Sequence, residues 1–331
     1  MGKYIGKRLL LFIPTIFIIS VTIFFIIQLP EGDYVSSYVA RMQAEGEVFT
    51  SQDISKLREQ YGLDKPWYAQ YGSWAKNIIT KGDFGYSFSY SRPVWSVIMD
   101  RLPLTLLVSL VIMIFTYVVS IPIGIYSATH QYSTGDYLFT AIGFLGMATP
   151  NFLLAIILMY FSFLWTGDPL LGLFSKEMLQ QGIHLGNLGE FLRRMVIPTI
   201  VIGTAGTCGI IRTVRGQMID EMTQQYALTA RAKGVSERVI IYKYCLRVAL
   251  NPVVSGLSGA LSSIFSGSTI SAIVMNLAIQ GPVLYDALKS QDMYLAGTIL
   301  LVQAVLVLFG TLLSDITLAW LDPRIRFGER S

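Results

Sequence analysis

Charged residues are scarce in this chain of 331 residues. Lysine, arginine, aspartate and glutamate make up 14% of the sequence, whereas soluble domains carry about 25%. Hydrophobic residues make up 53%, and the mean hydropathy is +0.55. The composition therefore excludes an ordinary soluble domain and is typical of an integral membrane protein. The net charge of +4 is modest, and we expect no nucleic-acid partner.

Residues that carry redox, metal or nucleotide chemistry are also few. The two cysteines (Cys208 and Cys245) and the two histidines (His130 and His184) do not have the spacing of a metal or redox motif. The sequence lacks a Gly-x-x-x-x-Gly-Lys-[Ser/Thr] phosphate-binding loop, since Gly2–Lys7 is one residue short. We therefore expect a chain with no catalytic residue, metal or cofactor, and with no ATP site of its own.

Long uncharged runs, by contrast, are abundant. A helix that crosses a bilayer needs about 20 apolar residues, and six runs reach or approach this length. They are Leu9–Leu29, Leu104–Thr129, Tyr137–Trp165, Met195–Ile211, Val248–Ile279 and Met293–Ser314. We therefore predict an all-α integral membrane fold with six transmembrane helices in the lipid bilayer. Pro150 is expected to kink the third of them.

The six runs contain no aspartate, glutamate, lysine or arginine. Proton- and ion-driven transporters usually carry ionisable groups inside the membrane, because the relay must hold charge. This absence argues against a self-powered secondary transporter or channel, which is one alternative function. A membrane enzyme is another alternative, and the lack of clustered histidine, cysteine, aspartate or glutamate argues against it.

The runs divide the chain into four segments. These are an N-terminal transmembrane helix (1–29), an extracytoplasmic segment (30–101), a membrane core with five more helices (102–321) and a tail (322–331). Within the second segment, Ser51–Tyr61 and Trp67–Ile79 are predicted to be helices.

Basic residues set the orientation. Lysine and arginine concentrate in the short cytoplasmic segments of membrane proteins. Three are found near the N-terminus, seven in the loop 212–247 and three in the tail. Six spans place these three segments on one side, so we expect both termini and the loop 212–247 to be cytoplasmic.

The most informative part of that loop is Gln225–Pro252. Its residue types predict a short helix that ends at Lys233, closed by Gly234 in the left-handed conformation. Ser236 is expected to cap a second helical run that ends at Pro252. The small side chains of Ala227, Ala230 and Gly234 predict a flat face that the groove of a partner protein could approach. The alternative is a solvated basic connector between two membrane helices.

This stretch resembles the EAA-type coupling loop of ABC importer permeases, in the form found in the dipeptide and oligopeptide family. The matching residues are Tyr226, Ala230, Arg231, Ala232, Lys233 and Gly234, followed by Leu246, Arg247, Ala249, Leu250 and Pro252. Gln225 stands where the family usually has an acidic residue, and Val248 where it usually has asparagine. The string GLDKPWYAQY, together with GDFGYSFSYSRPV and RLPLT, also resembles that family.

The resemblance implies a permease subunit that forms half of a translocation pore in the cytoplasmic membrane of a bacterium or archaeon. The implied partners are a second homologous permease subunit, two cytoplasmic ATP-binding subunits and an extracytoplasmic solute-binding protein. ATP would be bound by the partner subunits. The implied ATPase-coupling residues are Tyr226, Ala227, Ala230, Arg231, Ala232, Lys233 and Gly234.

Peptides and oligosaccharides both remain open as the cargo. Peptide-type members usually carry Glu-x-x-Phe-x-x-Pro-Gly-Leu-Gly after the fifth span. Residues 275–284 instead read MNLAIQGPVL, without the acidic residue, the phenylalanine or the Pro-Gly order. This variant is similar to the oligosaccharide-uptake branch of the family.

Small and hydroxyl residues form a stripe in the fifth apolar run. They are Ser255, Ser258, Gly259, Ser262, Ser263 and Ser266. Because they recur three, four, seven, eight and eleven positions after the first, they share one helical face. The stripe predicts either close helix packing or a neutral wall of the translocation path, and one face can serve both.

Overall fold

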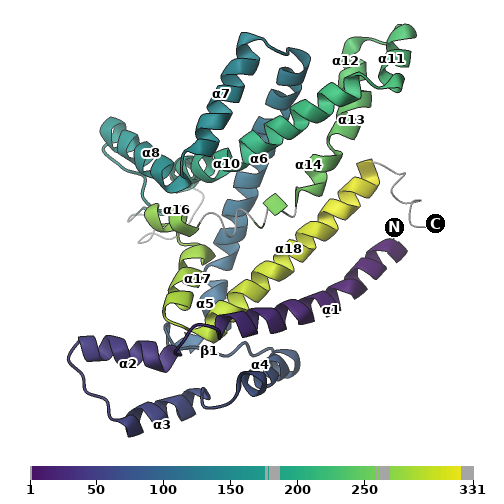
Figure 1. Cartoon of the computed structure of the whole chain (residues 1–331). Coiled ribbons are helices and arrows are strands. Elements are labelled where there is room, and N and C mark those ends of the chain that lie inside the picture. Colours follow the sequence, from purple (N-terminus) through teal and green to yellow (C-terminus); the bar gives the residue numbers. More distant parts are fainter. Residues whose placement is uncertain are drawn as a thin grey trace. The chain divides into compact units, whose positions relative to one another are not determined.

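The computed structural model describes residues 2–175, 178, 187–257, 259–260, 262 and 269–321. Almost all regular structure in these residues is helical (Figure 1). The exception is a short antiparallel hairpin of β1 (Tyr86–Ser87) and β2 (Arg92–Pro93). Two compact units divide the chain. The first consists of Met1–Thr105 and Ile279–Leu306, and the second of Leu106–Ala278 and Val307–Ser331.

The first unit combines the N-terminal third of the chain with α17 and the beginning of α18. Its elements are α1 (Gly2–Ile27), α2 (Tyr34–Ala44), α3 (Ser51–Tyr61), α4 (Trp67–Lys81), α5 (Val94–Met99), the start of α6 (Leu102–Thr129), α17 (Gln280–Lys289) and the first half of α18 (Met293–Leu321). A capping box between Thr50 and Asp53 begins α3, and Gly62 ends it in the left-handed conformation. The predicted helices Ser51–Tyr61 and Trp67–Ile79 are therefore confirmed.

Apolar side chains from distant parts of the sequence hold this unit together. One cluster joins α5, α17 and α18 through residues such as Val97, Ala287 and Ile299. A second cluster places Phe24 of α1 against Trp74 of α4, with ring centroids 5.5 Å apart. The unit thus fixes α2–α4 and the hairpin next to the start of α18.

The second unit is built around α10 (Leu188–Met222). Its other elements are the rest of α6, α7 (Thr134–Ala148), α8 (Asn151–Thr166), α11 (Gln225–Ala232), α12 (Glu237–Val239), the π-helix η2 (Ile240–Cys245), α13 (Leu246–Ala249), α14 (Asn251–Ser255), α16 (Thr269–Val274) and the rest of α18. The helices α7 and α8 both pack against α10.

Several helices are long and apolar enough to cross a membrane. Among the described residues these are Arg8–Ile27, Val94–Thr129, Leu188–Met222 and Met293–Trp320. The pair α7 and α8 adds a fifth candidate, bent by 106° at the break that precedes Asn151. The expected kink at Pro150 is therefore confirmed, because proline cannot supply the N–H that a continuous helix requires.

The predicted fifth run, Val248–Ile279, lies partly outside the described residues. The structure therefore supports a mostly helical, multi-pass membrane protein with four or five candidate spans. The count of six stays a prediction.

Glycines allow α6 and α7 to approach α10 closely. A Cβ atom added to Gly124 of α6 would lie 2.7 Å from Cβ of Val214 and 3.1 Å from the carbonyl oxygen of Ile211. A Cβ atom on Gly143 of α7 would lie 2.9 Å from Sγ of Cys208. Small residues are the usual means of close helix contact in membranes. The position of α10 in this unit therefore depends on these glycines.

We predict opposite stability changes for two glycine-to-alanine substitutions. Gly124→Ala should lower the free energy of unfolding by about 1–3 kcal/mol, because the new methyl group overlaps Val214. Gly216→Ala should raise it by about 0.5–1 kcal/mol, since nothing lies within 4 Å of the added Cβ and alanine favours helix. Thermal unfolding of the purified protein in detergent measures both stability changes. An equal rise in the melting temperature of the two variants would contradict the close packing of α6 on α10.

Candidate functional site

The helix α11 ends as its sequence predicts. Gly234 has a φ of +76°, in the left-handed region that favours glycine. Its N–H donates to the carbonyl oxygen of Arg231 at 2.9 Å, and the N–H of Val235 donates to that of Ala230 at 3.1 Å. This pair of hydrogen bonds is a Schellman motif, which satisfies the last carbonyl groups of the helix. The predicted left-handed cap at Gly234 is confirmed.

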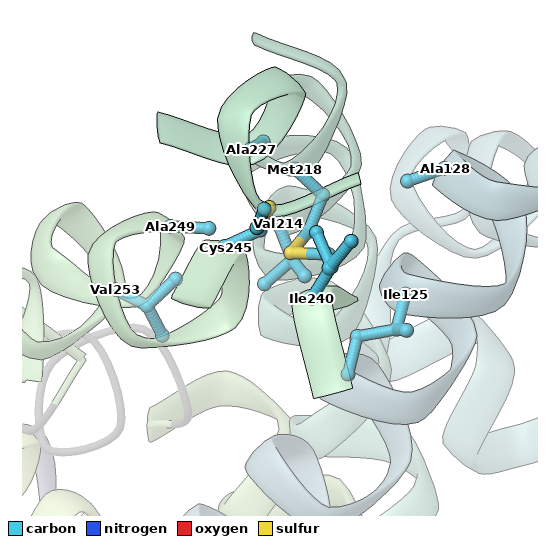
Figure 2. Close-up of a cluster of buried hydrophobic side chains, with 10 residues drawn as sticks. Ile125, Ala128, Val214, Met218, Ala227, Ile240, Cys245, Ala249 and Val253 are labelled. Atoms are coloured by element: carbon cyan, nitrogen blue, oxygen red, sulfur yellow. The ribbon is translucent and has the colours of Figure 1, made fainter. Parts of the chain in front are cut away.

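The inner face of α11 is buried within the chain itself. Ala227 is 0% exposed and Ala230 is 8% exposed. Figure 2 shows Ala227 among side chains of α10, η2 and α13. The buried members of this cluster are Ile125, Ala128, Val214, Met218, Ala227, Ala230, Ile240, Cys245, Ala249 and Val253. The expectation that Ala227 and Ala230 offer a flat face to a partner is therefore wrong, because their small side chains let α11 approach its own α10 and η2.

The opposite face of α11 is exposed. It carries Gln225, Leu228, Thr229 and Ala232, which follow one another at steps of three, one and three and so share one side of the helix. Leu228 is 48% exposed, although it is apolar. We call these four residues the outer face of α11. Sequence reasoning missed Leu228 and Thr229, although their helical spacing from Gln225 and Ala232 was available as a signal.

Arg231 links three segments of the loop 212–247, which we call the coupling region. Its Nη2 and Nε atoms lie 2.6 Å and 3.1 Å from the carboxylate oxygens of Glu237, at the start of α12. Its Nη1 donates to the carbonyl oxygen of Met222, the last residue of α10, at 2.9 Å. The hydrogen bond from Arg231 holds the pKa of the Glu237 carboxyl below its usual range. Arg231 therefore ties α11 to the elements before and after it.

Tyr226 anchors the beginning of α11. Its hydroxyl donates a short hydrogen bond to the carboxylate of Glu221 on α10. Burial, followed by this contact with Glu221, raises the pKa of Tyr226. Cys245 of η2 is fully buried, and its Sγ lies 3.6 Å from the carbonyl oxygen of Glu221. Tyr226, Ala227, Ala230 and Arg231 therefore attach α11 to its own chain, whereas Ala232, Lys233 and Gly234 are exposed.

The chain after Gly234 departs from the predicted single helical run. Ser236 stands at the N-cap position of α12, but its side chain makes no capping hydrogen bond. The helix then widens into the π-helix η2, a geometry often found at functional sites. The helical run continues through α13 and ends at Ala249, whereas the sequence predicted an end at Pro252. Pro252 lies in the first turn of α14, where a helix tolerates a residue without an N–H.

The membrane part of the second unit contains a cavity of about 380 Å³. Its walls come from α6, α8, α10 and Ala260. They include two polar side chains, Thr116 and Asn151, and two glycines of α10, Gly206 and Gly209. The cavity is therefore a candidate part of a translocation path. Sequence reasoning missed these residues, although Gly203, Gly206 and Gly209 recur every third position along α10.

The predicted stripe in the fifth apolar run stays a prediction. Ser255, Gly259 and Ser262 are exposed in the chain by itself. Ser258, Ser263 and Ser266 lie outside the described residues. Ala260, next to Gly259, lines the cavity. The position of Ala260 therefore fits both functions predicted for the stripe, close helix packing and a wall of the translocation path.

Both parts of the sequence match a known family of membrane components. Residues 120–327 match the family described as the binding-protein-dependent transport system inner membrane component. Residues 1–111 match the family that describes the N-terminal part of such components. The first match contains α11 and the walls of the cavity that come from α8, α10 and Ala260. The three α6 residues of the lining, Ile112, Met113 and Thr116, lie between the two matches. The second match contains α2–α4 and the hairpin.

Curated relatives are similar over their full lengths. The oligopeptide transport system permease protein AppB of Bacillus subtilis is 34% identical, with 99% of this chain and 100% of that protein covered. The peptidoglycan transport system permease protein YejB of Agrobacterium fabrum is 31% identical, with 100% of both chains covered. The oligopeptide transport system permease protein OppB of Haemophilus influenzae is 30% identical, with 99% of this chain and 100% of that protein covered.

We predict that α11 loses its place on α10 when its inner face or its cap is changed. Ala230→Glu should lower the stability of the coupling region by about 3 kcal/mol or more, because the carboxylate would enter an apolar cluster without a cation. Gly234→Val should lower it by about 1–3 kcal/mol, since a β-branched residue is strained at a positive φ. Trypsin cleavage at the exposed Arg238 in inverted membrane vesicles reports both losses.

Ala232→Glu is the matched control, because it introduces the same carboxylate on the exposed side of the same helix. Its cleavage rate should equal that of the wild type. Equal rates for all three variants and the wild type would show that the inner face does not hold α11.

Proposed function

The chain belongs to the family of binding-protein-dependent transport system inner membrane components, and on this premise we propose that α11 couples an ATPase to a translocation path. The chain is the permease subunit of an ABC importer, and ATP hydrolysis takes place on separate subunits. The observation that carries the proposal is that α11 has one buried face and one exposed face. One face is locked to its own chain, while the outer face is open to a partner.

The contacts of α11 provide a mechanical route into the membrane. Tyr226 and Arg231 attach α11 to the last turn of α10, through Glu221 and the carbonyl group of Met222. The same helix lines the cavity at Gly209, about 20 Å from Met222 at the rise of an α-helix. A displacement of α11 by a closing ATPase would therefore move α10, and with it one wall of the cavity. No step in this route requires covalent chemistry on the permease.

We propose six transmembrane helices with both termini in the cytoplasm. The basic residues of loop 212–247 support this orientation, because cytoplasmic loops are rich in lysine and arginine. The orientation places the outer face of α11 where an ATP-binding subunit can reach it. It also places α2–α4 and the hairpin outside the cell, where a solute-binding protein can approach them.

The proposed assembly contains two permease subunits, two cytoplasmic ATP-binding subunits and an extracytoplasmic solute-binding protein in the bilayer of a bacterial or archaeal cytoplasmic membrane. The relatives named as oligopeptide and dipeptide permeases support short peptides as cargo. Oligosaccharides are the second candidate, supported only by the departure of residues 275–284 from the usual peptide-type segment. Identification of the ligand carried by the cognate binding protein separates the two.

Co-purification tests the central proposal against a self-powered transporter. Leu228→Glu should reduce recovery of the ATPase with the tagged permease about 10-fold, because the interface would then bury a carboxylate without a cation in place of an exposed apolar side chain. Uptake in whole cells should fall with it, while the thermal stability of the permease should stay unchanged. Arg238→Ala, at an exposed position beyond Gly234, is the control and should have a small effect.

A permease that purifies without any ATPase and still transports solute would contradict the proposal. Full ATPase recovery and full uptake with Leu228→Glu would remove α11 from the coupling route and leave the family assignment intact.

The cavity gives a separate prediction. Gly209→Leu should reduce uptake at least about 10-fold, because the leucine side chain extends from a cavity wall into the solute's space. ATPase recovery should stay normal. Gly209→Ala should retain transport, since nothing lies within 4 Å of the added Cβ. Normal uptake of a peptide by the leucine variant in reconstituted vesicles would exclude this cavity from the path.

A further inference from the structure

The first unit contains a second cavity, of about 430 Å³, far in sequence from the coupling region. Three segments form its walls: α2, the hairpin with the turn that it encloses, and the C-terminal end of α17. The lining includes Tyr38 and Arg41 from α2, Tyr90 from the hairpin, and Asp286 and Lys289 from α17. Neither the coupling route nor the membrane cavity uses any of these residues.

Hydrogen bonds fix the three walls to one another. The hydroxyl of Tyr34 donates to the carbonyl oxygen of Phe88 at 3.0 Å, which joins α2 to the hairpin. The hydroxyl of Ser37 donates to Oε1 of Gln291 at 2.6 Å, which joins α2 to the residues after α17. The hydroxyl oxygens of Ser89 and Ser290 are 2.7 Å apart. The walls are therefore held in place without a ligand.

A buried carboxylate strengthens the same frame. Asp292 is 0% exposed and accepts hydrogen bonds from Oγ of Ser87 at 2.7 Å and from the N–H of Ser89 at 3.0 Å. It also accepts from the N–H of Leu295 in the first turn of α18, at 3.3 Å. Burial raises the pKa of Asp292, and no lysine or arginine pairs with it among the described residues. Its role is therefore to position the hairpin, including the Ser89 wall of the cavity.

The open side of the cavity carries more positive than negative charge. Arg41 and Lys289 are exposed, and within the described part of the chain neither forms a salt bridge. The guanidinium of Arg41 lies 5.8 Å from the ring centroid of Tyr38. Asp286 is the one acidic residue of the described lining. Two unpaired cations and one carboxylate therefore face the solvent across the cavity.

The chemistry of the walls fits a protein surface better than a small solute. Tyrosine and arginine dominate the centres of protein–protein interfaces, and Tyr38, Tyr90 and Arg41 all line this cavity. Pockets for small ligands are mostly lined by hydrophobic side chains, whereas every described lining residue of this cavity carries a hydroxyl or a charge. Burial and the charge of Asp286 raise the pKa of Tyr90, so its hydroxyl remains a hydrogen-bond donor.

We propose that this cavity receives an acidic side chain, aspartate or glutamate, from the surface of the extracytoplasmic solute-binding protein. The carboxylate would pair with Arg41 and Lys289 and accept a hydrogen bond from Tyr90, while Asp286, on the same helix as Lys289, would repel it and so restrict its position. The inference rests on the proposed function, which supplies the partner and the outward orientation of this unit. It names the surface of the permease and the charge of the partner residue.

The experiment uses the complete transporter in proteoliposomes and the solute-binding protein that stimulates its ATPase. ATPase rates are measured against the concentration of that protein for wild type and for Arg41→Glu/Lys289→Glu. The double variant should raise the half-saturating concentration at least about 10-fold at low salt, because two attractions become repulsions. The saturated rate should stay the same, and added NaCl should narrow the difference.

Lys76→Glu/Lys81→Glu on α4 is the matched control, since it reverses two exposed charges of the same unit at positions that do not line the cavity. Its half-saturating concentration should equal that of wild type. A photo-crosslinking phenylalanine analogue at Tyr38 should label the binding protein, and the same analogue at the exposed Tyr68 should not.

Three outcomes separate the possible failures. An unchanged half-saturating concentration and salt dependence in the double variant would overturn this inference alone. Binding of a free tripeptide to wild type but not to the double variant, without the binding protein, would also overturn it, because the cavity would then be a solute site. A wild-type complex whose ATPase no binding protein stimulates would overturn the proposed function itself.

Discussion

The contact of Ala227 and Ala230 with α10 and η2 is the constraint on which the coupling region depends. These methyl groups let the backbones of α11, α10 and η2 approach one another around Val214, Met218 and Cys245, each of which is 0% exposed. Tyr226 and Arg231 can reach Glu221 and Met222 only because α11 lies this close. The outer face of α11 is the side of the helix that these contacts leave exposed. A larger residue on the inner face would change both faces at once.

The features that follow from local chemistry were predictable from the sequence. Gly234 ends α11 because glycine accepts a positive φ, and Pro150 breaks a span because it lacks an N–H. The scarcity of charge identified the membrane class, and the residues from Tyr226 to Pro252 identified the family that the comparisons show. Each of these inferences depends on neighbouring residues or on composition.

Features that depend on distant residues were not predictable. Small residues at positions 227 and 230 suit both internal packing and docking of a partner. They are buried inside the chain because they pack in one cluster with Val214 of α10 and Ile240 of η2. The cavity at Gly206 and Gly209 depends on how α6 meets α10. The walls of the charged cavity in the first unit come from α2, the hairpin and α17, which lie up to about 250 residues apart in the sequence. No single stretch contains its pattern.

The Schellman motif and the Arg231 contacts also bear on the energetics of docking. Fixing the backbone of one residue costs about 1–2 kcal/mol of conformational entropy, and α11 has eight residues. Gly234 already ends this helix, and its side chains attach it to α10. The conformational entropy of its backbone is therefore lost when the permease folds, before an ATPase binds. An ATPase that binds the outer face therefore orders little new structure, and the free energy of its contacts is retained as affinity.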